Sequence, residues 1–179
     1  FGHDSVSLWD ETDGFFYDVL VPNDGSPTTS LPVRSLVGLL PLLGVGIAPD
    51  WTTTELPDFT ERLRWLRRNR PAETDSIFVT TAEGAAQATL MAIPPERHAR
   101  LLTRMLDEGE FLSPFGIRSL SAAYRGGSTV RLPSGELSIT YTPGESDTGL
   151  FGGNSNWRGP VWMPVNVLLA DALRVYAAG

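Results

Sequence analysis

Residues 152–166 read GGNSNWRGPVWMPVN and lead into the most regular helical pattern of the chain. The stretch holds two tryptophans five positions apart, one arginine and three asparagines among glycines and prolines. Aromatic faces stack on the apolar side of a pyranose ring while amide and guanidinium groups bond its hydroxyls, so this composition is typical of a sugar-binding pocket. The alternative is a Gly/Pro turn whose tryptophans are simply buried.

Helical spacing is clearest directly after this stretch and recurs upstream. Apolar residues repeat every 3.6 positions over 165–176, and Pro164 suits the first turn of that helix. We also expect a helix over 35–48 kinked at Pro41, a helix over 58–68 with a capping box formed by Asp58 and Glu61, and a helix over 95–105.

Turn signals between these helices predict three hairpins. They cover residues 15–21 ahead of the turn at 22–25, residues 76–93 around 82–84, and residues 130–141 across 133–135, with Val130 facing Leu137. Long connections of this kind are usually functional. Helices separated by long loops that carry hairpins are expected in a segment of an α/α toroid. The pattern therefore predicts a mainly α fold with β-hairpin insertions in its loops.

Composition limits the possible partners. The chain has 179 residues, 41% of them apolar and 20% charged, which is typical of one globular domain. Its net charge of -7 disfavours a nucleic-acid partner. The apolar run at 36–49 is too short to span a bilayer, so we expect no membrane partner, and cytoplasm is the default location.

Metal and thiol chemistry have little support in the sequence. The chain has no cysteine and two histidines, and His98 falls on the apolar face of its expected helix, as a core histidine does. Acidic residues crowd the first loop, where they could form a solvated turn, an acid/base pair or a Ca²⁺ site. We favour the turn and expect Arg34 to pair with one of these acids: Asp10, Glu11, Asp13 and Asp18. No cofactor is expected.

Four stretches resemble the catalytic (α/α)6-barrel region of glycoside hydrolase family 63 and its bacterial relatives, which include processing α-glucosidases and mannosylglycerate hydrolases. They are LWDETDGFFYDVL (8–20), VRSLVGLL (33–40), EFLSPFGIRSLS (110–121) and ESDTGLFGGNSNWRGPVWMPVN (145–166). The resemblance implies one segment of an (α/α)6 toroid, incomplete at both ends and completed by the rest of the barrel. It also implies hydrolysis of an α-linked glucoside or mannoside with inversion.

Inversion requires a carboxylic acid and a carboxylate roughly 6.5 to 9.5 Å apart, so that a water fits between the base and the sugar. The resemblance places both groups outside this segment, which we therefore expect to be inactive alone. Within it, Glu145 and Asp147 are the best carboxylates for lining a pocket.

The resemblance assigns the segment a role in binding the sugar. Asn166 could instead cap the following helix. The expected substrate-binding residues are Trp157, Trp162, Arg158, Asn154, Asn156 and Asn166. Two other classes remain open: a non-catalytic carbohydrate-binding or scaffold domain, and a helical interaction module in which the tryptophans only pack.

Overall fold

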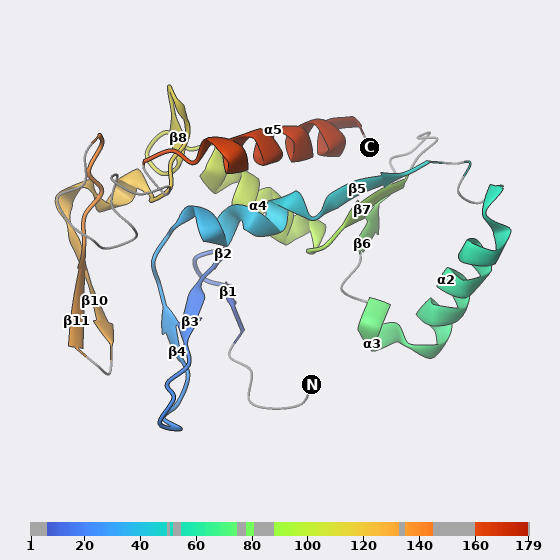
Figure 1. Cartoon of the computed structure of the whole chain (residues 1–179), viewed down its shortest axis with the longest axis horizontal. Helices are drawn as coiled ribbons and strands as arrows, with labels where there is room; N and C mark the ends of the chain where they lie inside the picture. The colour runs from blue at the N-terminus through green and yellow to red at the C-terminus, as the bar shows by residue number, and fades with distance from the viewer. Residues whose placement is uncertain are drawn as a thin grey trace. The chain divides into compact units, whose positions relative to one another are not determined.

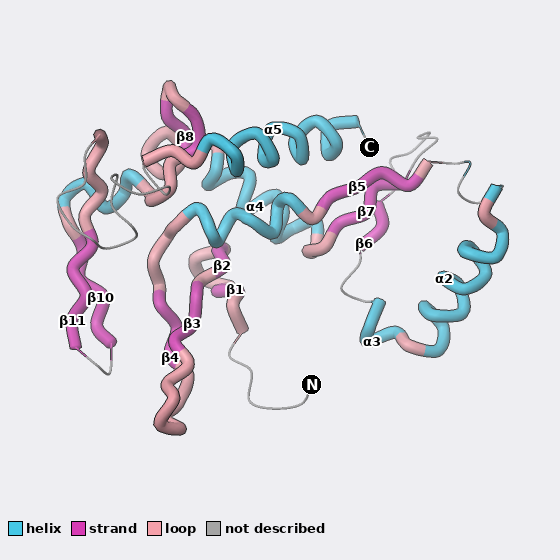
Figure 2. Tube along the Cα trace, viewed as in Figure 1, coloured by secondary structure: helices cyan, strands magenta, loops and turns pink. Residues whose placement is uncertain are grey.

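The computed structural model describes residues 7–49, 51, 55–74, 78–80, 88–132, 135–144 and 160–178. Its internal contacts divide the chain into two compact units. Unit 1 consists of Phe1–Leu40 and Arg100–Asn166, and unit 2 of Pro41–Ala99 and Val167–Gly179. Short strands, mostly in consecutive pairs, are interspersed with helices along the chain (Figures 1 and 2).

The helices begin where proline is best tolerated, because a first-turn residue has no intrahelical partner for its N–H. Pro57, Pro71 and Pro95 each open one. Within the described residues the α-helices are α2 (Pro57–Asn69), α3 (Pro71–Thr74), α4 (Pro95–Met105) and α5 (Met163–Ala178), with 3-10 helices η1 (Leu36–Leu43) and η2 (Ala122–Gly126). The predictions for 95–105 and 165–176 are confirmed.

The strands form five small antiparallel sheets in the described part of the chain. Four are two-stranded: β1 (Trp9–Asp10) with β2 (Phe15–Phe16), β3 (Asp18–Leu20) with β4 (Thr29–Leu31), β8 (Leu112–Ser113) with β9 (Gly116–Ile117), and β10 (Ser128–Leu132) with β11 (Gly135–Ile139). The fifth has the order β5 (Val45–Ala48), β7 (Ala88–Met91), β6 (Phe78–Thr80).

Each predicted hairpin corresponds to an antiparallel pair. β3 pairs with β4 beyond the 22–25 turn, and β6 pairs with β7. In the third hairpin Val130 lies opposite Leu137, as the alternation predicts.

The prediction of a mainly α segment of an (α/α)6 toroid is wrong. The described residues combine four α-helices with five antiparallel sheets, so strands are a main component of the fold and not loop decoration. No pair of long consecutive helices occurs within the described ranges, because hairpins separate α3 from α4 and α4 from α5.

Two local predictions also need correction. The helix expected over 35–48 is η1 followed by strand β5, since Val45 and Ile47 are β-branched and pair with β7. The capping box at Asp58 is absent, because α2 begins one residue earlier at Pro57 and its N-cap, Leu56, makes no side-chain cap bond. Asp58 instead lies in the first turn, where its negative charge interacts favourably with the helix dipole.

The core of unit 1 is aromatic and aliphatic. Phe15 and Phe111 are fully buried and stack with ring centroids 5.8 Å apart. Gly38 lies against the Phe15 ring and the Phe16 carbonyl, leaving no room for a side chain. A second cluster joins Val33 to the β10–β11 hairpin, with Val130 and Ile139 buried. These two clusters fix the hairpins that carry the site.

Candidate functional site

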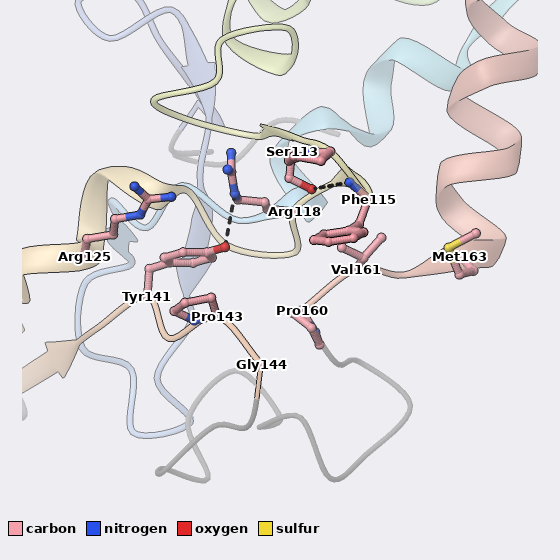
Figure 3. Close-up of a pocket in the computed structure, with 11 residues that line it drawn as sticks. Ser113, Phe115, Arg118, Arg125, Tyr141, Pro143, Gly144, Pro160, Val161 and Met163 are labelled. Carbon is pink, nitrogen blue, oxygen red and sulfur yellow. Dashed lines mark hydrogen bonds between the residues drawn. The ribbon is translucent and has the colours of Figure 1, made fainter.

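Unit 1 contains a pocket of about 530 Å³ (Figure 3), within the range of small-molecule sites. Its lining combines two aromatic rings, two arginines and three prolines with a few small or aliphatic residues. The described lining residues are Ser113, Pro114, Phe115, Arg118, Arg125, Tyr141, Pro143, Gly144, Pro160, Val161 and Met163.

Phe115 is presented by the turn between β8 and β9. Ser113 Oγ donates a hydrogen bond to the Gly116 carbonyl at 2.6 Å and accepts one from the Phe115 N–H at 3.2 Å. Gly116 has φ 123°, which a residue with a side chain rarely adopts. The turn is thereby closed, and Phe115 stays 83% exposed at the pocket.

Tyr141 follows β11 and lies near two guanidinium groups. The Arg118 and Arg125 guanidinium carbons are 5.7 and 5.6 Å from its ring centroid, within cation–π distance. Arg118 Nε also donates to the Tyr141 hydroxyl oxygen at 3.1 Å (Figure 3). The two guanidinium groups therefore hold the Tyr141 ring in its position at the pocket.

The chemistry of this lining is that of binding. Aromatic faces and proline rings offer apolar surface, and arginines offer N–H donors for hydroxyl or other oxygen atoms. None of the described lining residues is a carboxylate. The described lining can hold a polar, ring-shaped ligand, and an acid/base pair would have to come from elsewhere.

Two of the predicted substrate-binding residues lie in the described part of the chain. Asn166 Oδ1 accepts from the Ile117 N–H at 2.6 Å, while its Nδ2 donates to the carbonyls of Ile117 at 3.1 Å and Trp162 at 3.0 Å. Both ends of the amide thus join the start of α5 to β9. Trp162 is partly buried, and although its neighbours Val161 and Met163 line the pocket, Trp162 does not.

The other predicted site residues lie outside the described residues, within 145–159. The two ends of that stretch, Gly144 and Pro160, both line the pocket. The roles assigned from sequence to six residues stay predictions: Glu145, Asp147, Asn154, Asn156, Trp157 and Arg158.

Sequence reasoning missed the aromatic and basic residues of the pocket. Phe115 and Tyr141 are 26 positions apart and meet only through the tertiary structure. One signal was available: each lies beside a Pro–Gly-containing turn, Phe115 between Pro114 and Gly116 and Tyr141 before Pro143. An aromatic residue in such a turn has little neighbouring bulk to cover it.

Asp10, Glu11 and Asp13 lie in or beside a turn, as predicted, whereas Asp18 is the first residue of strand β3. Asp10 Oδ1 accepts from the Asp13 N–H at 2.8 Å, and Arg34 pairs with Asp13 at 3.4 Å, which confirms the expected ion pair. The Tyr17 hydroxyl donates a hydrogen bond to the Asp13 carboxylate. That bond, together with Arg34 and Arg104, lowers the pKa of Asp13, while burial and the same bond raise the pKa of Tyr17.

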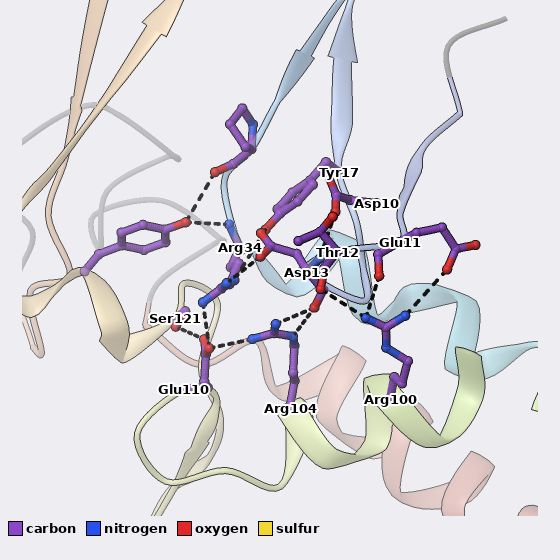
Figure 4. A network of polar contacts seen from close by, with 12 residues as sticks. Asp10, Glu11, Thr12, Asp13, Tyr17, Arg34, Arg100, Arg104, Glu110 and Ser121 are labelled. Atoms are coloured by element: carbon purple, nitrogen blue, oxygen red, sulfur yellow. Dashed lines mark hydrogen bonds and ion pairs between the residues drawn. The ribbon is translucent and has the colours of Figure 1, made fainter. Parts of the chain in front are cut away.

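Beside this turn, Glu110 is the centre of a polar network (Figure 4). Its Oε1 accepts from Arg34 Nη1 and Arg104 Nη1, both at 2.8 Å, and Ser121 Oγ donates to Oε2. Arg104 Nε donates to the Asp13 carbonyl at 3.0 Å. Glu110 is 8% exposed and is not among the described residues that line the pocket of Figure 3. The network joins segments of unit 1.

His98 is a core residue of unit 2, as its helical position predicts. It is 2% exposed, and its ring centroid lies 4.3 Å from that of Tyr176. Its Nδ1 has no hydrogen-bond partner in the described part of the chain, and burial lowers its pKa. No group of three or more His, Cys, Asp or Glu side chains suited to a metal ion occurs among the described residues.

The chain is similar to a protein of yeast. A Saccharomyces cerevisiae protein, named uncharacterized protein YMR196W, is 41% identical over 171 residues, covering 94% of this chain and 16% of that protein. The chain therefore spans about a sixth of its relative's length. No protein-family model matches the chain, and no solved structure matches it. No helix in the described ranges is long and apolar enough to cross a bilayer.

Proposed function

We propose that this chain contributes the sugar-binding wall of a glycoside hydrolase that acts with inversion on an α-linked glucoside or mannoside. The observation that carries the proposal is the pocket in which Phe115 and Tyr141 stand beside two arginines. A pyranose has an apolar C–H face and a rim of hydroxyls, and this lining offers a matching surface for each.

The sequence around the pocket supports the same class of ligand. The chain leaves the pocket at Gly144, passes through the Asn- and Trp-rich stretch, and returns to it at Pro160. The resemblance to family 63 rests most strongly on that stretch. Substrate and enzyme class are therefore drawn from the described lining and from the 152–166 motif, which overlap at Pro160, Val161 and Met163.

Catalysis requires carboxyl groups that the described lining lacks. Glu145 and Asp147 follow Gly144 directly in the sequence and are the candidates within this chain. The other source is a longer protein, since the yeast relative is about six times the length of the matched region. We place the reaction in the cytoplasm.

A non-catalytic carbohydrate-binding domain is the second candidate. It is favoured by one observation, the absence of carboxylates from the described pocket lining. Binding without turnover would then be the whole function of this region.

The first test is titration of the chain with glucose, mannose and mannosylglycerate, followed by calorimetry and tryptophan emission. We expect at least one saccharide to bind, and Phe115→Ala and Tyr141→Ala to weaken that binding. Phe59→Ala, which removes a 53% exposed aromatic ring of α2, is the matched control and should have no effect. If no saccharide binds, the proposal is wrong and the interaction-module alternative is favoured.

The second test separates the enzyme from the binding domain. The full-length yeast relative is incubated with α-glucosides and α-mannosides, and proton NMR identifies the first anomer released. Release of the β-anomer supports an inverting hydrolase. Binding without release supports the non-catalytic alternative.

A further inference from the structure

Three tyrosine hydroxyls in unit 1 accept a hydrogen bond from an arginine N–H. Arg34 Nε donates to Tyr17 at 3.3 Å, the Arg34 backbone N–H to Tyr124 at 3.0 Å, and Arg118 Nε to Tyr141 at 3.1 Å. A phenol that accepts in this way still has its own hydrogen to donate. The three tyrosines differ in where that hydrogen goes.

Two of these hydroxyls donate within the protein. Tyr17 donates to Asp13, and Tyr124 donates to the Pro32 carbonyl at 3.4 Å. For Tyr141, no described residue accepts the hydroxyl hydrogen, and this tyrosine lines the pocket. Its donor is therefore available to a ligand.

Arg118 holds that hydroxyl in place. Its side chain is buried, with the residue 6% exposed, and its Nη1 donates to the carbonyls of Glu108 at 3.0 Å, Glu110 at 3.3 Å and Leu112. The Arg118 backbone N–H donates to the Phe111 carbonyl at 2.8 Å, and Arg118 forms an antiparallel bridge with Val161. The carbonyls that Nη1 contacts hold the guanidinium beside Tyr141, and the backbone contacts hold the segment that carries it.

We infer that the Tyr141 hydroxyl donates a hydrogen bond to an oxygen acceptor of the ligand, and that Arg118 is the positioning residue that directs it. With Nε occupying an oxygen lone pair, the hydroxyl hydrogen must point away from Arg118. The neighbouring positive charge polarises the O–H group and strengthens it as a donor. The inference rests on the proposed function and specifies a ligand with an accepting hydroxyl, ring or glycosidic oxygen.

The test compares two variants that each keep the aromatic ring and remove its hydroxyl, one in the pocket and one outside it. Tyr141→Phe should raise the dissociation constant of the bound saccharide, among glucose, mannose and mannosylglycerate, by about 3- to 10-fold. Tyr124→Phe removes a hydroxyl whose hydrogen bonds are internal, so it is the matched control. It should lower the melting temperature without changing affinity.

Arg118 is tested through its coupling to Tyr141. Arg118→Gln should weaken binding about as much as Tyr141→Phe, and the double variant should be no weaker than either single variant. Arg118→Lys, which retains a donor and the charge, should recover part of the affinity. A purely structural role for Arg118 would instead give losses that add to that of Tyr141→Phe. Protein labelled with 3-fluorotyrosine gives a second readout, since the Tyr141 fluorine resonance should shift when the saccharide is added.

The outcomes separate the two proposals. If the unmodified chain binds none of the three saccharides, the proposed function fails and this inference fails with it. If it binds one and Tyr141→Phe binds that saccharide equally well, with no shift of the fluorine resonance, only the inference is overturned. Additive losses in the double variant overturn the role of Arg118 alone.

Discussion

Replacing Glu110 with glutamine should destabilise unit 1 more than any other single loss of charge among its described ion pairs. The carboxylate accepts from two guanidinium groups at 2.8 Å and from the Ser121 hydroxyl. Glutamine has nearly the same shape, so the change removes the charge and adds two donors that face arginines. The effect then measures electrostatics and hydrogen bonding with little change in packing.

The size of the effect follows from burial. Breaking a fully buried ion pair costs about 3–5 kcal/mol, because the remaining charge is left without compensation. The side chains of Arg34 and Arg104 are 22% and 23% exposed, so water recovers part of this loss. We therefore expect Glu110→Gln to lower the free energy of unfolding by about 2–4 kcal/mol.

Urea unfolding followed by circular dichroism at pH 7 gives this free energy. The control is Glu136→Gln in the Arg131–Glu136 pair, whose N–O distance is 3.2 Å but whose side chains are 87% and 63% exposed. That variant should change the free energy of unfolding by less than about 1 kcal/mol. Equal effects in the two variants would refute the view that burial of Glu110 makes its network important.

Three further predictions concern packing, titration and surface. Gly38→Ala places a methyl group against the Phe15 ring and the Phe16 carbonyl, so it should lower the free energy of unfolding by about 1–3 kcal/mol. Gly126→Ala, which has open space around it, should lower that free energy little, and thermal melts compare the two variants. Burial lowers the pKa of His98 below its ordinary 6.5, so the unfolded chain binds the proton more readily. Stability should then fall as the pH drops below about 6.5, and His98→Gln should flatten that dependence in melts between pH 7 and 5. On α2, Leu63 is 37% exposed and lies one turn from the 53% exposed Phe59. Leu63→Gln should therefore change the melting temperature by less than about 1 °C and raise the solubility limit. A clear loss of stability would show that another part of the protein covers this face.

Sequence pattern was enough to predict the helices and hairpins that are determined by residues close to one another in the chain. The 3.6-residue repeat predicts α5, and turn residues between alternating strands predict the β10–β11 hairpin with Val130 opposite Leu137. Strand β5 could not be found in this way, because Val45–Ala48 becomes a strand only by pairing with β7, more than forty positions later. Counting such strands as helix or loop produced the mainly α prediction that the structure overturns.

In the same way, some contacts of the candidate site were predicted from sequence and others were not. Arg34, which precedes an expected helix, was predicted to pair with one of the acids crowded in the first loop, and Asp13 is that acid. Glu110 gave no signal, since its environment depends on Arg34, 76 positions away, as well as on the nearby Arg104. Phe115 and Tyr141 likewise become a pocket only when the β8–β9 turn and the end of β11 lie together.

The amide of Asn166 also has a consequence for how the protein ages. Spontaneous deamidation would turn the Nδ2 donor into a carboxylate oxygen directed at the Ile117 and Trp162 carbonyls. Attraction would become repulsion at a side chain that connects the beginning of α5 to β9. Replacement of this one nitrogen by oxygen during storage would then weaken the attachment of this helix end, so mass spectrometry of stored protein should look for deamidation at position 166.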